Sequence, residues 1–218
     1  MKIAVIGASG KTGRELVREA LSRGHRVVAV CRDPSAGKLD EFAGRDDVEV
    51  HGVPVVSDEA VLTDALSGCD GVVAILVSVR KLRATELVTS LVKATAANGV
   101  TRLSFTAGEV TAEHGEGEPL SLRQRIMRAV VPPLVELTPF SVKDMLAAST
   151  LIQRQTQWGW SILRAPTLRD TPAVGYRMCE ISEVTGKDAL SRRDYAACLL
   201  DSLDLPERYR RTLTVVGR

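Results

Sequence analysis

The feature that most constrains the fold is a glycine-rich turn close to the beginning of the chain. Four consecutive apolar residues, Ile3–Ile6, are typical of a fully buried parallel strand. The segment 7–13, GASGKTG, follows directly, and after it comes a helical pattern whose apolar face holds Leu16, Val17, Ala20 and Leu21. This strand–turn–helix order predicts the first unit of a doubly wound, mostly parallel α/β sheet, the Rossmann fold.

The three glycines of the turn have the spacing expected of a dinucleotide site. Gly7 permits the tight turn, Gly10 lets backbone amides approach a pyrophosphate, and Gly13 permits close packing of helix on strand. A P-loop would need a glycine five residues before Gly10, but Val5 stands there inside the strand, so that alternative fails on spacing. A plain strand–helix connection without a ligand is the remaining alternative.

The end of the second predicted strand, Val27–Cys31, carries information on the cofactor. Arg32 stands where a dinucleotide-binding unit places its ribose-reading residue, and Asp33 is one residue late. An arginine here suits the 2′-phosphate of NADP, and Lys11 and Lys38 add positive charge nearby. The sequence therefore favours NADP over NAD, with a plain surface arginine as the alternative.

The rest of the chain alternates apolar runs with helical patterns and shows no linker or repeat, which predicts one domain over residues 1–218 with a small appendage at the carboxyl end. The apolar run Val72–Val77 should end beside the glycine turn, where the strand order reverses and ligands bind. The other expected strands are Val48–His51, Val100–Thr106, Trp158–Leu163 and Thr212–Val216. The other expected helices are one capped by Asp58 or Ser57 and ending at Leu66, Thr85–Asn98 with Gly99 as its cap, Val142–Gln155, and one that follows Ser191 and ends at Leu203.

The regular alternation of predicted strands and helices is interrupted between residues 108 and 139. A loop at His114–Pro119 is followed by an amphipathic segment, Leu122–Val131, and then by Pro132-Pro133 as a helix breaker. Because the segment follows the carboxyl end of a strand, it is placed to act as a lid or as an oligomer contact. The sequence leaves both alternatives open.

Composition excludes several other classes of protein. The formal net charge of +2 over 218 residues gives no reason to expect nucleic acid or a membrane as partner. The four cysteines and three histidines lack metal-ligand spacing, so we expect no metal site. Free thiols, no secretory signal and no apolar run of membrane-spanning length predict a cytoplasmic protein.

These motifs, together with WSILRAP at 160–166 and LRDTP at 168–172, resemble the atypical short-chain dehydrogenase/reductases. The resemblance covers nearly the whole chain and is closest to the NAD(P)H-binding, NmrA-like group that contains flavin reductase (biliverdin-IX-beta reductase). It implies NADPH lying across the strand ends. It also implies that Ser9, Lys11 and Thr12 meet the phosphates, that Arg32 meets the 2′-phosphate, and that Leu76, Val77, Ser78 and Pro166 lie on the nicotinamide side.

The sequence departs from the wider family at its catalytic residues. No tyrosine has a lysine four residues later, so the Tyr-x-x-x-Lys acid pair is absent and epimerase chemistry is disfavoured. Ala107 and Leu146 stand where the flavin-reductase group has a serine and a histidine. Thr106 and Lys143 are the remaining polar candidates for catalysis, and each has a purely structural alternative.

These observations predict an NADPH-dependent oxidoreductase that transfers hydride to a flavin, a quinone or a similar planar small molecule. Hydride transfer to such an acceptor needs alignment more than acid catalysis, because the cofactor carries the chemistry. A non-catalytic NADP(H)-binding redox sensor is the principal alternative, and an isomerase on the same scaffold is a weaker one. We expect a monomer or a homodimer.

Overall fold

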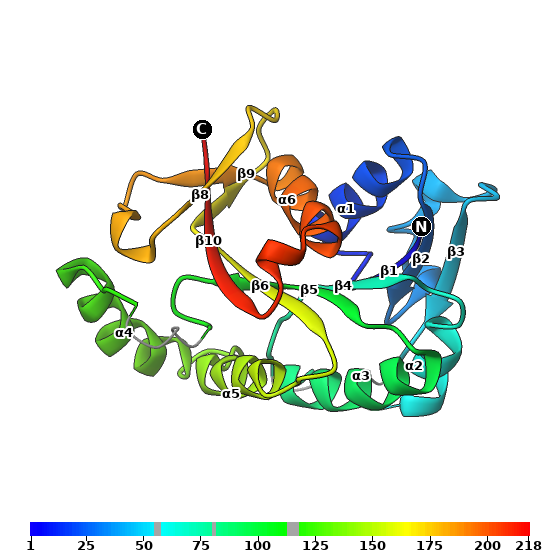
Figure 1. Ribbon diagram of the computed structural model, residues 1–218, viewed down its shortest axis with the longest axis horizontal. Coiled ribbons are helices and arrows are strands. Elements are labelled where there is room, and N and C mark those ends of the chain that lie inside the picture. The colour runs from blue at the N-terminus through cyan, green and yellow to red at the C-terminus, as the bar shows by residue number, and fades with distance from the viewer. Residues whose placement is uncertain (55–57, 80–81, 113–117) are drawn as a thin grey trace.

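The computed structural model describes residues 1–54, 58–79, 82–112 and 118–218. Within these ranges an eight-stranded sheet has the order β3-β2-β1-β4-β5-β6-β10-β8, parallel except for β8 (Figure 1). Its strands are β1 (Lys2–Ile6), β2 (Arg26–Cys31), β3 (Val48–Gly52), β4 (Gly71–Ala74), β5 (Arg102–Gly108), β6 (Gly159–Ala165), β8 (Tyr176–Cys179) and β10 (Arg211–Gly217). The predicted Rossmann fold is therefore confirmed.

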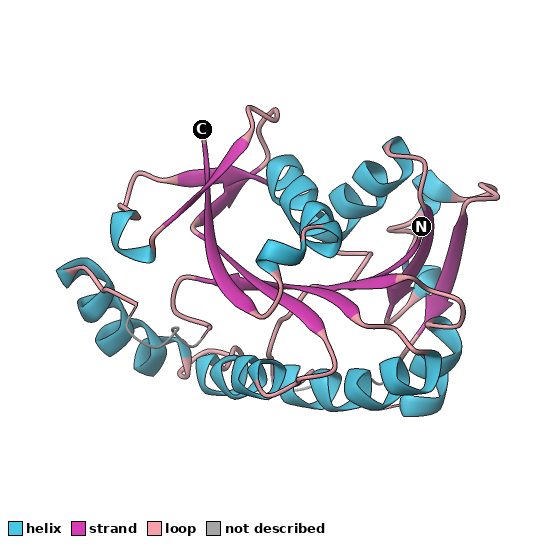
Figure 2. Ribbon diagram, in the orientation of Figure 1, coloured by secondary structure: helices cyan, strands magenta, loops and turns pink. Residues whose placement is uncertain are grey.

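Helices cover both faces of the sheet (Figure 2). On one face lie α1 (Lys11–Ser22) and α6 (Arg192–Asp204), which pack against each other. On the other lie α2 (Glu59–Ala65), α3 (Ala84–Asn98) and α5 (Val142–Gln153). The inner strands are buried on both faces, which explains why their sequences are continuously apolar. Two apolar cores result, one on each side of the sheet.

The predicted fourth strand is three residues too long. The ladder ends as the backbone N–H of Ile75 donates to Ile6 O at 3.1 Å. The next N–H, that of Leu76, donates instead to the Thr106 hydroxyl at 2.9 Å. Residues 76–78 therefore leave the sheet and form a loop at its carboxyl edge, which brings them to the side of the glycine turn.

The prediction that Pro132-Pro133 breaks the helix was wrong. Helix α4 (Leu122–Val135) runs through both prolines. The φ angle that the proline ring imposes is compatible with a helix, and the turn continues because the N–H of Glu136 donates to Pro132 O at 3.0 Å. In Figure 1 this helix lies at one end of the molecule, beyond α5.

The carboxyl-terminal segment adds elements that the sequence did not indicate. Strand β8 extends the main sheet in the antiparallel sense, and β7 (Thr167–Arg169) pairs with β9 (Ala189–Ser191) in a small sheet of their own. Ser57 and residues 114–117 of the predicted loop lie outside the described residues, whereas Asp58 caps α2 as expected. No helix in the described part of the chain is both long and apolar enough to cross a membrane.

Candidate functional site

Two adjoining cavities open at the carboxyl edge of the sheet, where β1 and β4 meet and the strand order reverses. The larger has a volume of about 510 Å³ and the smaller about 280 Å³, and Ile75 and Val77 line both. Most of the residues singled out in the sequence line one of them. The smaller cavity is lined by Gly7, Ser9, Gly10, Arg32 and Val77. The larger cavity is lined by Thr12, Leu76, Val77, Ser78, Thr106 and Pro166.

The glycine turn has the geometry that its spacing predicts. Gly7 has φ +85°, a conformation that side chains rarely adopt. A Cβ on Gly13 would lie 2.2 Å from Gly7 O, so only glycine lets α1 pack this closely on the turn. The structure thus explains the glycines physically, while their contact with a phosphate remains a prediction.

The beginning of α1 faces this turn without a cap. Its N-cap is Gly10, which has no side chain to accept a hydrogen bond, and the first turn holds no acidic residue. Such a helix start offers free backbone N–H groups and positive potential to an anion. Lys11, expected at the phosphates, lines neither cavity and forms an exposed ion pair with Asp170 at 3.1 Å.

The cationic side chains of Arg32 and Lys38 line the smaller cavity. Both are exposed, and neither has an ion-pair partner among the residues that the structure describes. Asp33 is engaged elsewhere, because its carboxylate accepts from the N–H and the hydroxyl of Ser35 at 2.9 and 2.6 Å. The end of β2 therefore presents positive charge to the cavity, which suits a phosphorylated ribose.

The larger cavity is apolar. Among the described residues that line it none is charged, and Val110, Val131, Val135, Phe140 and Met145 form much of its wall. The Thr106 hydroxyl lines it at the end of β5 and accepts the Leu76 N–H at 2.9 Å, which leaves the threonine its own proton to donate. This wall suits an uncharged molecule.

A buried carboxylate that the sequence analysis missed supports the loop between the cavities. Asp144 of α5, whose side chain is 2% exposed, accepts from the Ser78 hydroxyl at 2.7 Å and from the Ala84 N–H at 2.7 Å. It also accepts from the Thr85 hydroxyl at 2.6 Å and from the Arg83 guanidinium at 2.9 Å. Burial raises the pKa of Asp144, but the hydrogen bonds from Thr85, Ser78 and Arg83 outweigh it and the pKa is lowered.

This network reaches both cavities, because Ser78 lines the larger and Arg83 the smaller. Asp144 follows Ser141 with the spacing of a helix cap. The cap is formed, because the Asp144 N–H donates to the Ser141 hydroxyl at 3.2 Å. That local pattern is the only sequence signal for Asp144. Its partners lie about sixty residues earlier, so the pattern does not indicate them.

Tyr195 also lines the larger cavity, but its phenol is fully engaged. The hydroxyl donates to Leu163 O at 2.6 Å and accepts the Ala107 N–H at 3.2 Å. Burial raises the pKa of this phenol well above its ordinary value. Tyr195 therefore links β5 and β6 through these two hydrogen bonds and is poorly suited to act as a proton donor.

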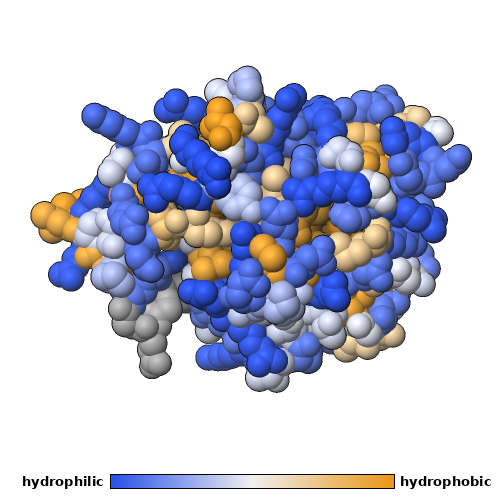
Figure 3. Space-filling view, turned by 45° about the horizontal axis from the view of Figure 1, so that its top comes forward, coloured by the Kyte–Doolittle hydropathy of each residue, from blue (hydrophilic) through white to orange (hydrophobic). Residues whose placement is uncertain are grey.

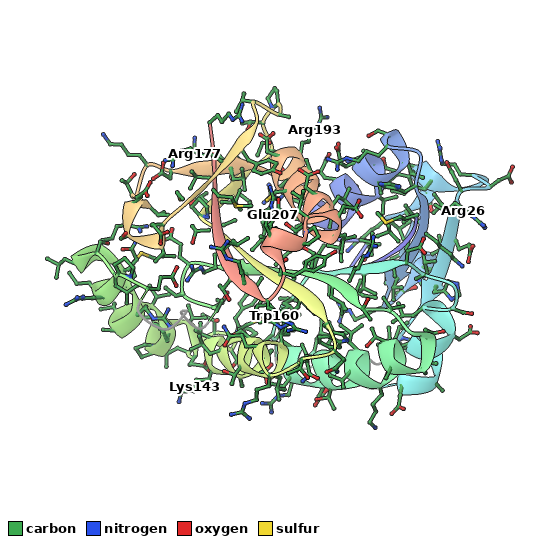
Figure 4. The ribbon with its side chains drawn as sticks, viewed as in Figure 1. Arg26, Lys143, Trp160, Arg177, Arg193 and Glu207 are labelled. Carbon is green, nitrogen blue, oxygen red and sulfur yellow. The ribbon has the colours of Figure 1, made fainter. Side chains whose placement is uncertain are left out.

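Lys143 does not reach either cavity. It lies on the solvent face of α5, and its side chain points away from the sheet at the lower edge of Figure 4. Its neighbours Val142 and Ser141, in contrast, do line the larger cavity. The structure thus places Lys143 outside the lining of both cavities, and its role near the nicotinamide stays a prediction.

Comparison with known proteins assigns the family. The model of a family described as NAD(P)H-binding matches residues 7–206, which include both the glycine turn and most of the cavity walls. The chain belongs to this NAD(P)H-binding family. The expected membership of an NAD(P)H-binding family is thereby confirmed.

One curated relative of this family member is an uncharacterized protein, YwnB of Bacillus subtilis (strain 168). It is 49% identical over 43 residues, a match that covers 20% of this chain and 20% of that protein. The chain thus matches about a fifth of the length of this relative.

Solved structures of similar fold match the family member over nearly its whole length. A short-chain dehydrogenase/reductase of Veillonella parvula in complex with NADP has a TM-score of 0.77 and 17% identity, covering 100% of this chain and 94% of that chain. ChuY, an anaerobilin reductase from Escherichia coli O157:H7, has a TM-score of 0.74 and 20% identity, with coverage of 100% and 97%. At these identities the likeness shows the fold alone.

Proposed function

We propose that the protein is an NADPH-dependent reductase that transfers hydride to an uncharged, planar, conjugated acceptor of the quinone or flavin type. The observation that supports this is the contrast between its two adjoining cavities. The smaller combines the glycine turn, the uncapped start of α1 and two cations. The described residues that line the larger cavity are all apolar or uncharged.

Each part of the protein has a definable role in this proposal. The bound nicotinamide supplies the hydride. The turn and the start of α1 bind the pyrophosphate, and Arg32 with Lys38 binds the 2′-phosphate. Leu76, Val77 and Ser78 orient the nicotinamide side together with Pro166; Asp144 holds Ser78, and the Thr106 hydroxyl holds the Leu76 N–H. The same threonine hydroxyl donates a hydrogen bond to a carbonyl of the acceptor. The apolar wall excludes water.

Two matched pairs of acceptors test the preference for an uncharged ring: naphthoquinone against its ring sulfonate, and riboflavin against its phosphate. Turnover is followed as loss of NADPH absorbance. Burying an unpaired charge costs a few kcal/mol, so the neutral quinone should have a kcat/KM at least about tenfold above that of the sulfonate. Absence of turnover with every acceptor, despite NADPH binding, would overturn the catalytic proposal.

Arg32→Ala tests the cofactor preference separately. A charge-assisted hydrogen bond contributes about 1.5–3 kcal/mol, so the variant should bind NADPH about ten- to a hundredfold more weakly. Binding of NADH, which lacks the 2′-phosphate, is the internal control and should not change. An equal loss for both cofactors would mean that Arg32 does not read the phosphate.

A redox-sensing role without turnover is the second candidate. It is favoured by the engagement of Tyr195 and Ser78 with protein partners and by the distance of Lys143 from the cavities, which leave few groups for acid catalysis. Calorimetric titration with NADPH and NADP distinguishes the two. Binding that discriminates between the redox forms, together with no turnover, would favour the sensor.

A further inference from the structure

Helix α4 and the turn directly after it carry a row of exposed apolar side chains. Leu122, Ile126, Val130, Leu134 and Leu137, which we call the α4 stripe, are 73, 54, 47, 58 and 81% exposed. The first four recur every four residues and share one face of the helix, and Leu137 lies in the turn that follows it. Figure 3 shows apolar atoms at the end of the molecule where α4 lies in Figure 1. Contiguous apolar surface of this kind marks an interaction site more often than a free surface.

The stripe faces outward because the opposite side of α4 is anchored. Gln124 is buried and donates to Ile181 O at 2.6 Å and Val184 O at 3.2 Å. Val131 and Val135 face inward and line the larger cavity. A rotation that buried the stripe would break these contacts, and the residues that the structure describes leave the stripe uncovered.

Charges beside the stripe indicate what covers it. Arg125 and Glu136 are eleven residues apart, close to three turns of 3.6 residues, so they flank the same side of the stripe. Arg125 has no ion-pair partner among the described residues. Glu136 accepts from the Ser141 hydroxyl and the Lys143 N–H through one carboxylate oxygen, Oε1.

We propose that the α4 stripe binds the α4 stripe of a second copy of this chain, with the two helices antiparallel about a two-fold axis near Val130. In such a pair equal flanks face each other, so Arg125 meets Glu136 of the partner subunit, and the partner's Arg125 meets Glu136. Arg125 also lies in a first turn without acidic residues, where the dipole of its own helix opposes it. The antiparallel arrangement places it beside the negative end of the other α4.

The size of the surface predicts a weak dimer. Fourteen residues of helix extend about 21 Å, which buries less than the roughly 800 Å² per partner of a standard interface. We therefore expect dissociation in the micromolar range. Because Val131 and Val135 lie on the inner side of the same helix, the dimer would cover the outer wall of the larger cavity.

Sedimentation velocity of the whole protein from about 1 to 200 μM tests the proposal. Val130→Glu places two carboxylates opposite each other at the axis and should weaken dimerisation at least tenfold. Val174→Glu is the matched control, because Val174 is 66% exposed and lies outside α4, and it should leave the dimer intact. A wild type that stays monomeric throughout the range, or a Val130→Glu variant that dimerises as the wild type does, overturns the proposal.

A charge exchange tests the antiparallel order. Arg125→Glu alone places like charges together and should weaken the dimer, and adding Glu136→Arg should restore it. Failure of the double variant to recover association, with an unchanged thermal unfolding midpoint, overturns the proposed pairing.

Discussion

Asp144→Asn should destabilise the protein by about 3 kcal/mol at neutral pH. The carboxylate accepts hydrogen bonds from Ser78, Arg83, Ala84 and Thr85 while its side chain is 2% exposed. The amide keeps one acceptor oxygen, but its NH₂ group points at donors. Hydrogen bonds to charged groups contribute about 1.5–3 kcal/mol each, and breaking a buried pair costs about 3–5 kcal/mol. Relief of the buried charge offsets part of that loss.

The pH dependence of this loss provides a second check. Because the pKa of Asp144 is lowered in the folded protein, its contribution is present above the ordinary carboxyl pKa and is lost as the pH falls through the folded value. The difference between wild type and variant should therefore shrink in acid. Urea unfolding at a series of pH values measures it.

Asp204→Asn is the matched control, because Asp204 is 52% exposed and, among the described residues, forms its ion pair with the exposed Arg102. We expect a change of at most about 1 kcal/mol there. A loss below about 1 kcal/mol for Asp144→Asn, or one that does not change with pH, would refute the view that this carboxylate fastens the loop.

Two further substitutions test the surroundings of the cavities. Gly13→Ala would place a Cβ 2.2 Å from Gly7 O and should cost at least about 3 kcal/mol of unfolding free energy and abolish NADPH binding. Gly186→Ala should be nearly neutral in the same assays, because the added Cβ would meet no atom of the described residues within 4 Å apart from those of its chain neighbours. Tyr195→Phe leaves the Leu163 carbonyl and the Ala107 N–H without their partner and should cost about 1–3 kcal/mol in urea unfolding. Because burial raises the pKa of Tyr195, the pH profile of turnover should keep its shape, and loss of an alkaline limb would show that the phenol titrates in catalysis.

The predictions that were confirmed depend on local patterns. Apolar runs identified the inner strands, and the spacing of Gly7, Gly10 and Gly13 identified the turn, because the steric demands of both lie within a few residues. From that turn, the place where ligands bind in an open parallel sheet follows by topology alone. Residues 76–78 were therefore assigned to the correct edge even though they do not belong to β4.

The features that the sequence did not predict depend on contacts between distant segments. The ladder of β4 does not continue past Ile75 because the Leu76 N–H donates to the Thr106 hydroxyl, thirty residues later in the chain. Lys143 and Asp144 are neighbours in sequence, but the direction of α5 sends the first to solvent and the second into the core. So short a pattern does not indicate which face of a helix will meet the rest of the protein. It also does not indicate that α4 continues through its prolines.

The position of α6 has a consequence for how this chain folds as it is synthesised. One face of the sheet is covered by α1 and α6 together, and Leu199, Leu200 and Leu203 of α6 belong to the same apolar core as Val5 and Val73. Until the ribosome has released residue 204, the part of that face formed by β4, β5 and β6 lacks the helix that covers it, however complete the first five strands are. Until α6 packs against it, the amino-terminal portion therefore exposes hydrophobic surface to water. A chaperone that binds such surface would act during this interval.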